Sequence, residues 1–232
     1  MDRNEWLKEI RPLMCHPSMD RVLLNDVSSK TFDFKNDLRI PAVLVCLVTE
    51  VQYRIWNGSI VNQGLSLLMM RRGFEVGALP GVWSMIAGVR DFVSSEGSVS
   101  VHTLSILSAL KEIEEETGIP VTMLEDEVVS IGCFLQPNPD KPEQSFVNVV
   151  VFARVKPGLT PAIHLCHEHT GAVWVPIESI REFCNNHQRF EDEKDKENKK
   201  KHPVLTQIVK DCVAQNMREE VLRMLLTHLD SK

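Results

Sequence analysis

The sequence predicts an α/β/α sandwich built on a mixed sheet, with helical extensions at both ends. Three observations predict it: apolar runs rich in β-branched residues, one long amphipathic helix among them, and turn residues between the segments. The chain has 232 residues, of which 43% are hydrophobic and 25% charged. This composition is ordinary for a globular protein, and the length is sufficient to bury a core.

Two strands are expected in the first half of the chain. Residues 39–54 are rich in Val, Leu and Ile and are typical of a buried strand. An Asn-Gly turn signal follows, and residues 64–72 predict the second strand. From Gly73 to Gly88 the glycines and prolines predict a loop that contains one short extended piece, VWSMIAG.

The clearest helix is expected over residues 101–117. Apolar residues repeat at helical spacing along one side of this segment: Leu104, Leu107, Leu110 and Ile113. Gly118 and then Pro120 follow, which is the usual order of residues at the end of a helix.

Two further strands are expected at 128–136 and 146–155, joined by a Pro-rich loop. A last strand begins at Ala172 and passes into a helix near Pro176, and this helix continues to about Asn186. The alternation of strands and helices indicates an α/β layer structure.

These elements divide the chain into four parts. Residues 1–37 form an N-terminal extension with a short amphipathic helix, and residues 38–186 form the α/β domain. Residues 187–202 are dense in charge and predict a flexible loop, and residues 203–232 form a C-terminal helix. That helix packs on the domain or joins two copies in a homodimer, and the sequence leaves both open.

Charge and cysteine usage limit the function classes. The net charge is −6 and the pI about 5.8, which argues against binding nucleic acid through bulk charge. A capped RNA end is the one nucleic-acid partner left open. The six cysteines form no CxxC pair, and no apolar stretch is long enough to span a bilayer. We therefore expect a cytoplasmic protein with reduced thiols and no membrane partner.

Candidate chemistry lies near the end of the predicted helix. Glu112, Glu115 and Glu116 are spaced i, i+3 and i+4, so a helix places them on one side at adjacent turns. Like charges in this arrangement repel one another, and a hard cation with oxygen ligands would remove the repulsion. The alternative interpretation is an acidic run on a solvated helix surface.

Three segments resemble one known family. KEIEEETGI, residues 111–119, resembles the second half of the Nudix box, with Lys111 where the family has Arg. LPGVWSMIAG resembles the strand and glycine turn before the box, with Gly88 as the opening glycine. EHTGAVWVPIESI, residues 168–180, resembles the segment that closes many Nudix domains. The chain is thus similar to the Nudix hydrolase superfamily over roughly residues 38–182, and a Nudix-like sandwich is implied.

The resemblance has two departures. Residues 89–101 contain an insertion relative to the family pattern, and Thr103 stands where the first glutamate of the box belongs. Glu96, inside the insertion, is a candidate to replace that glutamate. Lys111 keeps a supporting positive charge but lacks the planar fork of Arg.

The resemblance also implies roles for individual residues. Glu112, Glu115 and Glu116, with the carbonyl of Gly88, would hold Mg²⁺ or Mn²⁺. Glu112, Glu115 and the loop acid Glu168 are the candidates for the catalytic base. The implied reaction is hydrolysis of a diphosphate linkage in a nucleoside diphosphate joined to another group, such as ADP-ribose, a dinucleotide or a nucleotide sugar. The alternative is a catalytically weak or inactive Nudix fold that binds a nucleotide ligand or a protein.

Substrate-binding residues are expected on two strands. Arg71 and Arg72 end a strand near the expected pocket and are candidates for holding phosphate. Phe134 is a candidate for stacking on a base, and its alternative interpretation is a core residue. HLCHEH, residues 164–169, contains histidines and a cysteine in no compact zinc pattern and is interpreted as a loop.

Overall fold

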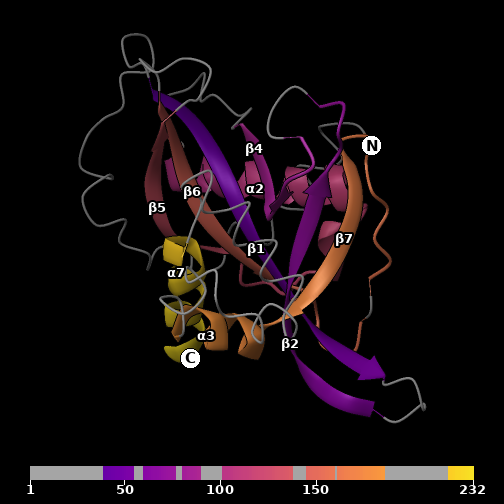
Figure 1. The fold of residues 1–232 in the computed structure, drawn as a ribbon. Coiled ribbons are helices and arrows are strands. Elements are labelled where there is room, and N and C mark those ends of the chain that lie inside the picture. The colour runs from indigo at the N-terminus through magenta and orange to yellow at the C-terminus, as the bar shows by residue number, and fades with distance from the viewer. Residues whose placement is uncertain are drawn as a thin grey trace, which may run out of the picture.

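The computed structural model describes seven ranges of the chain: 39–54, 60–76, 80–89, 101–137, 145–159, 161–185 and 219–232. They form a seven-stranded sheet with helices on both faces (Figure 1). The predicted α/β fold with a mixed sheet is confirmed. The expected N-terminal helix, most of the 89–101 insertion and the charged loop lie outside the described residues.

Four long strands make the body of the sheet. β6 (Ser145–Arg154) pairs in parallel along its whole length with residues 39–48 of β1 (Arg39–Arg54). β5 (Val129–Pro137) pairs with the outer side of β6, and β2 (Ile60–Arg72) pairs with β1, both antiparallel. The single parallel pair makes the sheet mixed.

Three short strands complete the sheet around β2 and the first half of β1. β4 (Ile86–Val89) pairs antiparallel with β1, and Gly88 lies opposite Val43. β3 (Trp83–Ser84) and β7 (His169–Pro176) both pair with β2. Because β7 continues the pairing with β2 as far as Arg72, it begins three residues before the predicted Ala172.

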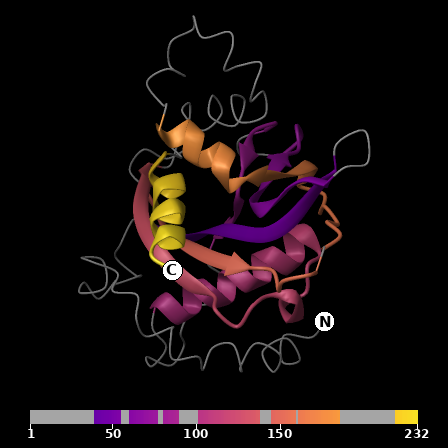
Figure 2. The same ribbon diagram turned by 90° about the horizontal axis from the view of Figure 1, so that it is seen from below.

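Helices cover the two faces of the sheet, as Figure 2 shows from below. α2 (Val101–Thr117) lies on one face, and α3 (Ile177–Asn185) and α7 (Glu219–Asp230) lie on the other. Successive residues of β1 alternate between the two cores, since Val45 packs with α2 and Cys46 packs with α7. The alternation explains why β1 is apolar along both sides.

The C-terminal helix is described only from Glu219 onward, and this part packs on the domain. Leu225 is fully buried in the core that α7 shares with the sheet. Arg181 on α3 forms two hydrogen bonds with Asp230, at 2.9 and 2.8 Å. In the described ranges, no helix is both long and apolar enough to cross a membrane.

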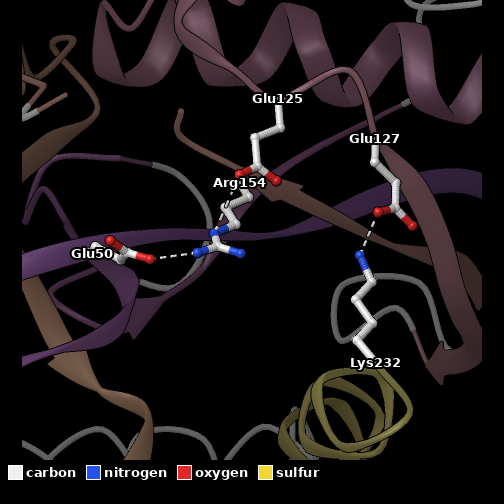
Figure 3. A network of polar contacts seen from close by, with 5 residues as sticks. All are labelled: Glu50, Glu125, Glu127, Arg154 and Lys232. Carbon is white, nitrogen blue, oxygen red and sulfur yellow. Dashed lines mark hydrogen bonds and ion pairs between the residues drawn. The ribbon is translucent and has the colours of Figure 1, made fainter. Parts of the chain in front are cut away.

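Two groups of polar contacts lie near the segment before β5, and one of them includes the C-terminal Lys232 (Figure 3). Nη2 of Arg154 on β6 lies 2.6 Å from Oε1 of Glu50 on β1, and its Nε lies 3.5 Å from Oε1 of Glu125. Lys232, after α7, pairs with Glu127 in the segment before β5. The end of the chain is thus held beside the start of β5, on the side of the sheet away from α2.

α2 ends as its sequence predicts. Gly118 has φ +70°, a left-handed conformation that favours glycine, and its N–H donates to the carbonyl of Glu114 at 2.9 Å. The hydroxyl of Thr117 donates to the carbonyl of Ile113 and accepts from the N–H of Ile119 at 3.1 Å. These bonds satisfy the last turn and fix the position of the acidic residues.

Candidate active site

α2 holds its three acidic candidates at different depths. Glu116 is buried, Glu112 is half-buried and Glu115 is exposed. The burial of each glutamate follows from the helix periodicity, because Glu116 lies next to the buried side of α2 that contains Ile113 and Thr117. Oε2 of Glu115 lies 3.4 Å from Nζ of Lys111, and the Glu115 side chain is 58% exposed. Lys111 therefore pairs along the helix surface, away from the buried acid.

Glu112 meets the glycine turn that was expected to face it. The Glu112 carboxylate lies so close to Gly88 that a Cβ on this glycine would overlap it. Only a residue without a side chain leaves room for a carboxylate at this point on β4. The structure thus brings the predicted opening glycine and one predicted acid into direct contact.

Glu116 is in an unusual electrostatic environment. Burial raises the pKa of Glu116 to about 8, and the Glu112 and Glu168 carboxylates add to the rise. Arg72 and a backbone hydrogen bond from Ala87 lower this pKa. Among the described residues, Oε2 of Glu116 has no hydrogen-bond partner. A buried carboxylate oxygen without a partner is costly in a folded protein and often marks a functional site.

The loop 164–169 brings a second group of side chains to these acids. The backbone N–H groups of His164 and Cys166 donate to the last carbonyls of α2, at 2.8 and 3.3 Å. Farther along, the carbonyl of Glu168 accepts from the N–H of Gly73, just after β2, at 2.7 Å. The loop therefore connects the end of the acidic helix to the end of β2.

Arg72 supplies the positive charge of the site. Its Nη2 lies 3.3 Å from Oε2 of Glu168, and the two side chains are 18% and 43% exposed. Its charge also acts on Glu116, as the pKa of that group shows. The guanidinium thus lies among acidic groups at the end of β2, where it can reach an anionic ligand.

Two substrate-binding candidates lie elsewhere. Nε of Arg71 donates to the carbonyl of Gly81 at 3.2 Å, and its guanidinium lies over the Phe74 ring, 5.0 Å from the centroid. Phe134 packs against the core on the α7 side of the sheet, so the structure does not bring it to the acids of α2. Of the substrate-binding candidates, only Arg72 neighbours Glu116.

Two residues of the loop 164–169 reach the site without having been predicted there. The His169 side chain is only 1% exposed, and its Nε2 lies 4.0 Å from Oε2 of Glu116. Sγ of Cys166 lies 3.4 Å from Nδ1 of the same imidazole. The sequence analysis interpreted the segment with His169 and Cys166 as a loop, and only tertiary structure shows that His169 approaches Glu116.

The donor set fits a hard divalent cation. Carboxylate and carbonyl oxygens are the ligands that Mg²⁺ and Mn²⁺ prefer, and Glu116 offers a buried oxygen with no hydrogen-bond partner in the described part of the chain. Within the same part, no three His, Cys, Asp or Glu groups are already gathered as a metal cage. Because Glu112 and Glu115 have flexible side chains at neighbouring turns, they can approach a cation by changing rotamer.

Comparisons with known proteins find similar folds but no similar sequences. No family model and no curated protein sequence matches the chain. Structural neighbours are Nudix hydrolases across most of the chain, at low identity. A Caenorhabditis elegans Ap4A hydrolase is 13% identical with TM-score 0.47, covering 83% of this chain and 99% of that one. A NUDIX hydrolase from Alicyclobacillus acidocaldarius is 17% identical with TM-score 0.45, covering 66% and 84%.

The NUDIX domain of Shewanella oneidensis NrtR, solved with ADP ribose, is 14% identical with TM-score 0.40, covering 78% of this chain and 88% of that one. At these identities and scores the likenesses decide nothing about activity. The chemistry of this chain is therefore argued from its own residues.

Proposed function

We propose that the chain is a metal-dependent hydrolase that cleaves the diphosphate linkage of a nucleoside diphosphate joined to another group. The observation that carries the proposal is the buried Oε2 of Glu116, which has no hydrogen-bond partner in the described part of the chain and lies near the charges of Glu112 and Arg72. Residues 38–186 would be the hydrolase domain, with the other three parts as extensions. A diphosphate presents the negative charge that both a bound cation and Arg72 would recognise.

Glu112, Glu116, Glu115 and the Gly88 carbonyl would hold Mg²⁺ or Mn²⁺. When bound, this cation supplies charge neutralisation at the diphosphate and lowers the pKa of water. Contact between Gly88 and the Glu112 carboxylate supports the assignment, since it brings two of the proposed ligand residues together on separate elements. Glu115 requires only a change of rotamer to leave Lys111, because a surface ion pair of this kind is weak.

The reaction needs a base and an anion-binding group from the chain. Water attacks one phosphorus atom, a carboxylate accepts the proton of the water, and the bond from phosphorus to the bridging oxygen breaks. Glu112, Glu115 and Glu168 are the candidates for that carboxylate. Arg72 would hold the phosphate oxygens and leave Glu168 as the substrate binds, which releases the Glu168 carboxylate for proton transfer.

A second function also has support from specific residues. Thr103 occupies the position of the first glutamate of the box, and Lys111 occupies the position of its arginine. Both features favour a Nudix-like module that binds a nucleotide ligand with little or no turnover. The two functions differ in one measurable respect, which is metal-dependent product formation.

A substrate panel tests the proposal. The protein is incubated with Mg²⁺ or Mn²⁺ and with ADP-ribose, NADH, nucleotide sugars, dinucleoside polyphosphates, coenzyme A and capped RNA, and products are resolved by chromatography. We expect product from at least one compound, dependent on metal and nearly abolished by Glu116→Gln. Glu114→Gln, on the same helix but outside the proposed site, is the matched control. Binding of a panel compound without product would favour the binding module.

A further inference from the structure

The imidazole of His169 lies beside Oε2 of Glu116, the oxygen that has no hydrogen-bond partner among the described residues. Nε2 of His169 lies 4.0 Å from Oε2 of Glu116, and both side chains are at most 8% exposed. This separation is longer than a hydrogen bond, so a bond between the two atoms requires the side chains to rotate toward each other. In a buried environment even this spacing gives an appreciable electrostatic interaction.

Cys166 contacts the imidazole nitrogen of His169 that lies away from Glu116. Its Sγ lies 3.4 Å from Nδ1 of His169. A thiol is a weak donor and an imidazole nitrogen can accept, so Sγ–H can donate to Nδ1 across this contact. The His169 side chain is only 1% exposed, and burial of this kind favours the uncharged form of an imidazole. A neutral ring that accepts at Nδ1 carries its N–H at Nε2, on the side of Glu116.

We propose that His169 is a positioning residue for Glu116: its neutral imidazole, oriented by Cys166, directs Nε2–H at Oε2 and holds that carboxylate in place as a metal ligand. This inference rests on the proposed function, because it assigns Glu116 to the cation. A neutral donor suits the task, since it stabilises the carboxylate without adding a full positive charge that would repel a cation.

Backbone hydrogen bonds hold Glu116, Cys166 and His169 close together. Cys166 N–H donates to the carbonyl of Glu116 at 3.3 Å, and His169 N–H donates to the carbonyl of Cys166 at 3.2 Å. Because both bonds lie within one turn of the loop that packs against α2, the main chain places His169 next to Glu116. The alternative is a core histidine with no effect on metal binding, and the two are separable by experiment.

Mn²⁺ affinity is the readout, measured by the paramagnetic resonance signal of free Mn²⁺ during titration of the intact protein. We expect His169→Leu to weaken Mn²⁺ binding by about ten- to hundredfold. His169→Gln, whose amide N–H reaches the position of Nε2, should keep the affinity within about threefold of the wild type. Cys166→Val should weaken binding, because the ring loses its orienting donor, and Cys166→Ser should restore it. His167→Gln, an exposed neighbour in the same loop, is the matched control.

Wild-type Mn²⁺ affinity in His169→Leu would overturn the inference, as would an equal loss in His169→Gln and His169→Leu. Thermal unfolding without metal shows whether each variant folds, and if His169→Leu does not, the Gln variant and the two Cys166 variants decide. A wild type that binds Mn²⁺ but hydrolyses nothing would remove the proposed catalysis and leave the positioning role intact. A wild type that takes up no Mn²⁺ would overturn both.

Discussion

The carboxylate of Glu112 fills the space that a side chain at Gly88 would occupy. This contact joins α2 to β4 across residues that the sequence separates by an insertion. It is the structural link between the glycine turn and the acidic helix, and it makes the site sensitive to a single methyl group.

Gly88→Ala tests this contact. The new Cβ would displace the Glu112 carboxylate, which is the movable end of a flexible side chain, so the fold should survive. We expect Mn²⁺ affinity to fall on the order of tenfold, while the free energy of unfolding changes by about 1 kcal/mol or less. Calorimetric titration measures the affinity and urea denaturation the stability. Gly64→Ala is the matched control, because a Cβ there meets no atom within 4 Å; equal effects from both variants would contradict the assignment.

The raised pKa of Glu116 predicts a pH-dependent stability in the metal-free protein. The folded-state pKa is about 8 and the ordinary value is 4.5, so the folded state holds this proton more tightly than the unfolded chain does. The stabilising contribution is therefore complete below pH 4.5 and is lost as the pH rises through about 8. Above that pH the protein buries an ionised carboxylate.

Urea denaturation without metal, from about pH 5 to pH 9, measures this effect. Relative to Glu116→Gln, which has no proton to lose, the wild type should lose on the order of 3 kcal/mol across the range. Mg²⁺ should reduce the loss, since a cation favours the ionised carboxylate. Parallel pH profiles for the two proteins would show that Glu116 is not the titrating group.

Arg72 and Arg71 should differ in their effect on substrate binding. Arg72 lies beside Glu168 and acts on Glu116, whereas Arg71 contacts the Gly81 carbonyl and the Phe74 ring. With a substrate identified from the panel, Arg72→Ala should raise KM by about ten- to hundredfold, because charged hydrogen bonds to phosphate are lost. Arg71→Ala serves as the matched comparison and should change KM much less. Steady-state kinetics decides, and a larger effect from Arg71→Ala would refute this placement of the phosphate.

Docking of α7 should contribute to the stability of the domain. Leu225 is fully buried between α7 and the sheet, so Leu225→Ala leaves a cavity and should lower the free energy of unfolding by about 2–4 kcal/mol. Thr227→Ala, exposed on the same helix, should change it by about 0.5 kcal/mol or less. Similar unfolding curves for both variants would mean that α7 does not pack on the sheet in solution.

The sequence predicts the bounds of the secondary-structure elements better than it predicts how deeply each side chain is buried or which rotamer it adopts. α2 begins and ends where the helical periodicity and Gly118 place it, because both are local signals. The spacing of Glu112, Glu115 and Glu116 predicts a shared side, but not that Glu116 is buried while Glu115 pairs with Lys111. Depth depends on the sheet and on the loop 164–169, which are distant in sequence.

Dependence on tertiary structure also explains why the sequence could not decide which substrate-binding candidates lie at the site. Arg71 and Arg72 lie on either side of a register shift in the β2–β7 pairing, so the alternation of side chains along a strand could not decide which arginine faces the site. Phe134 has the strand pattern of a core residue, but the sequence does not say which core it joins. His169 meets Glu116 only because β7 pairs with β2 and brings the preceding loop back to α2.

The central claim, that a divalent cation is bound between the acids of α2 and the glycine turn of β4, is tested most directly by locating manganese in crystals. Anomalous scattering at the manganese absorption edge from Mn²⁺-soaked crystals should give a peak within ligand distance of Glu112 and Glu116 and next to Gly88. A peak only at another place, with the Glu112 and Glu116 carboxylates turned away from each other, would contradict the account.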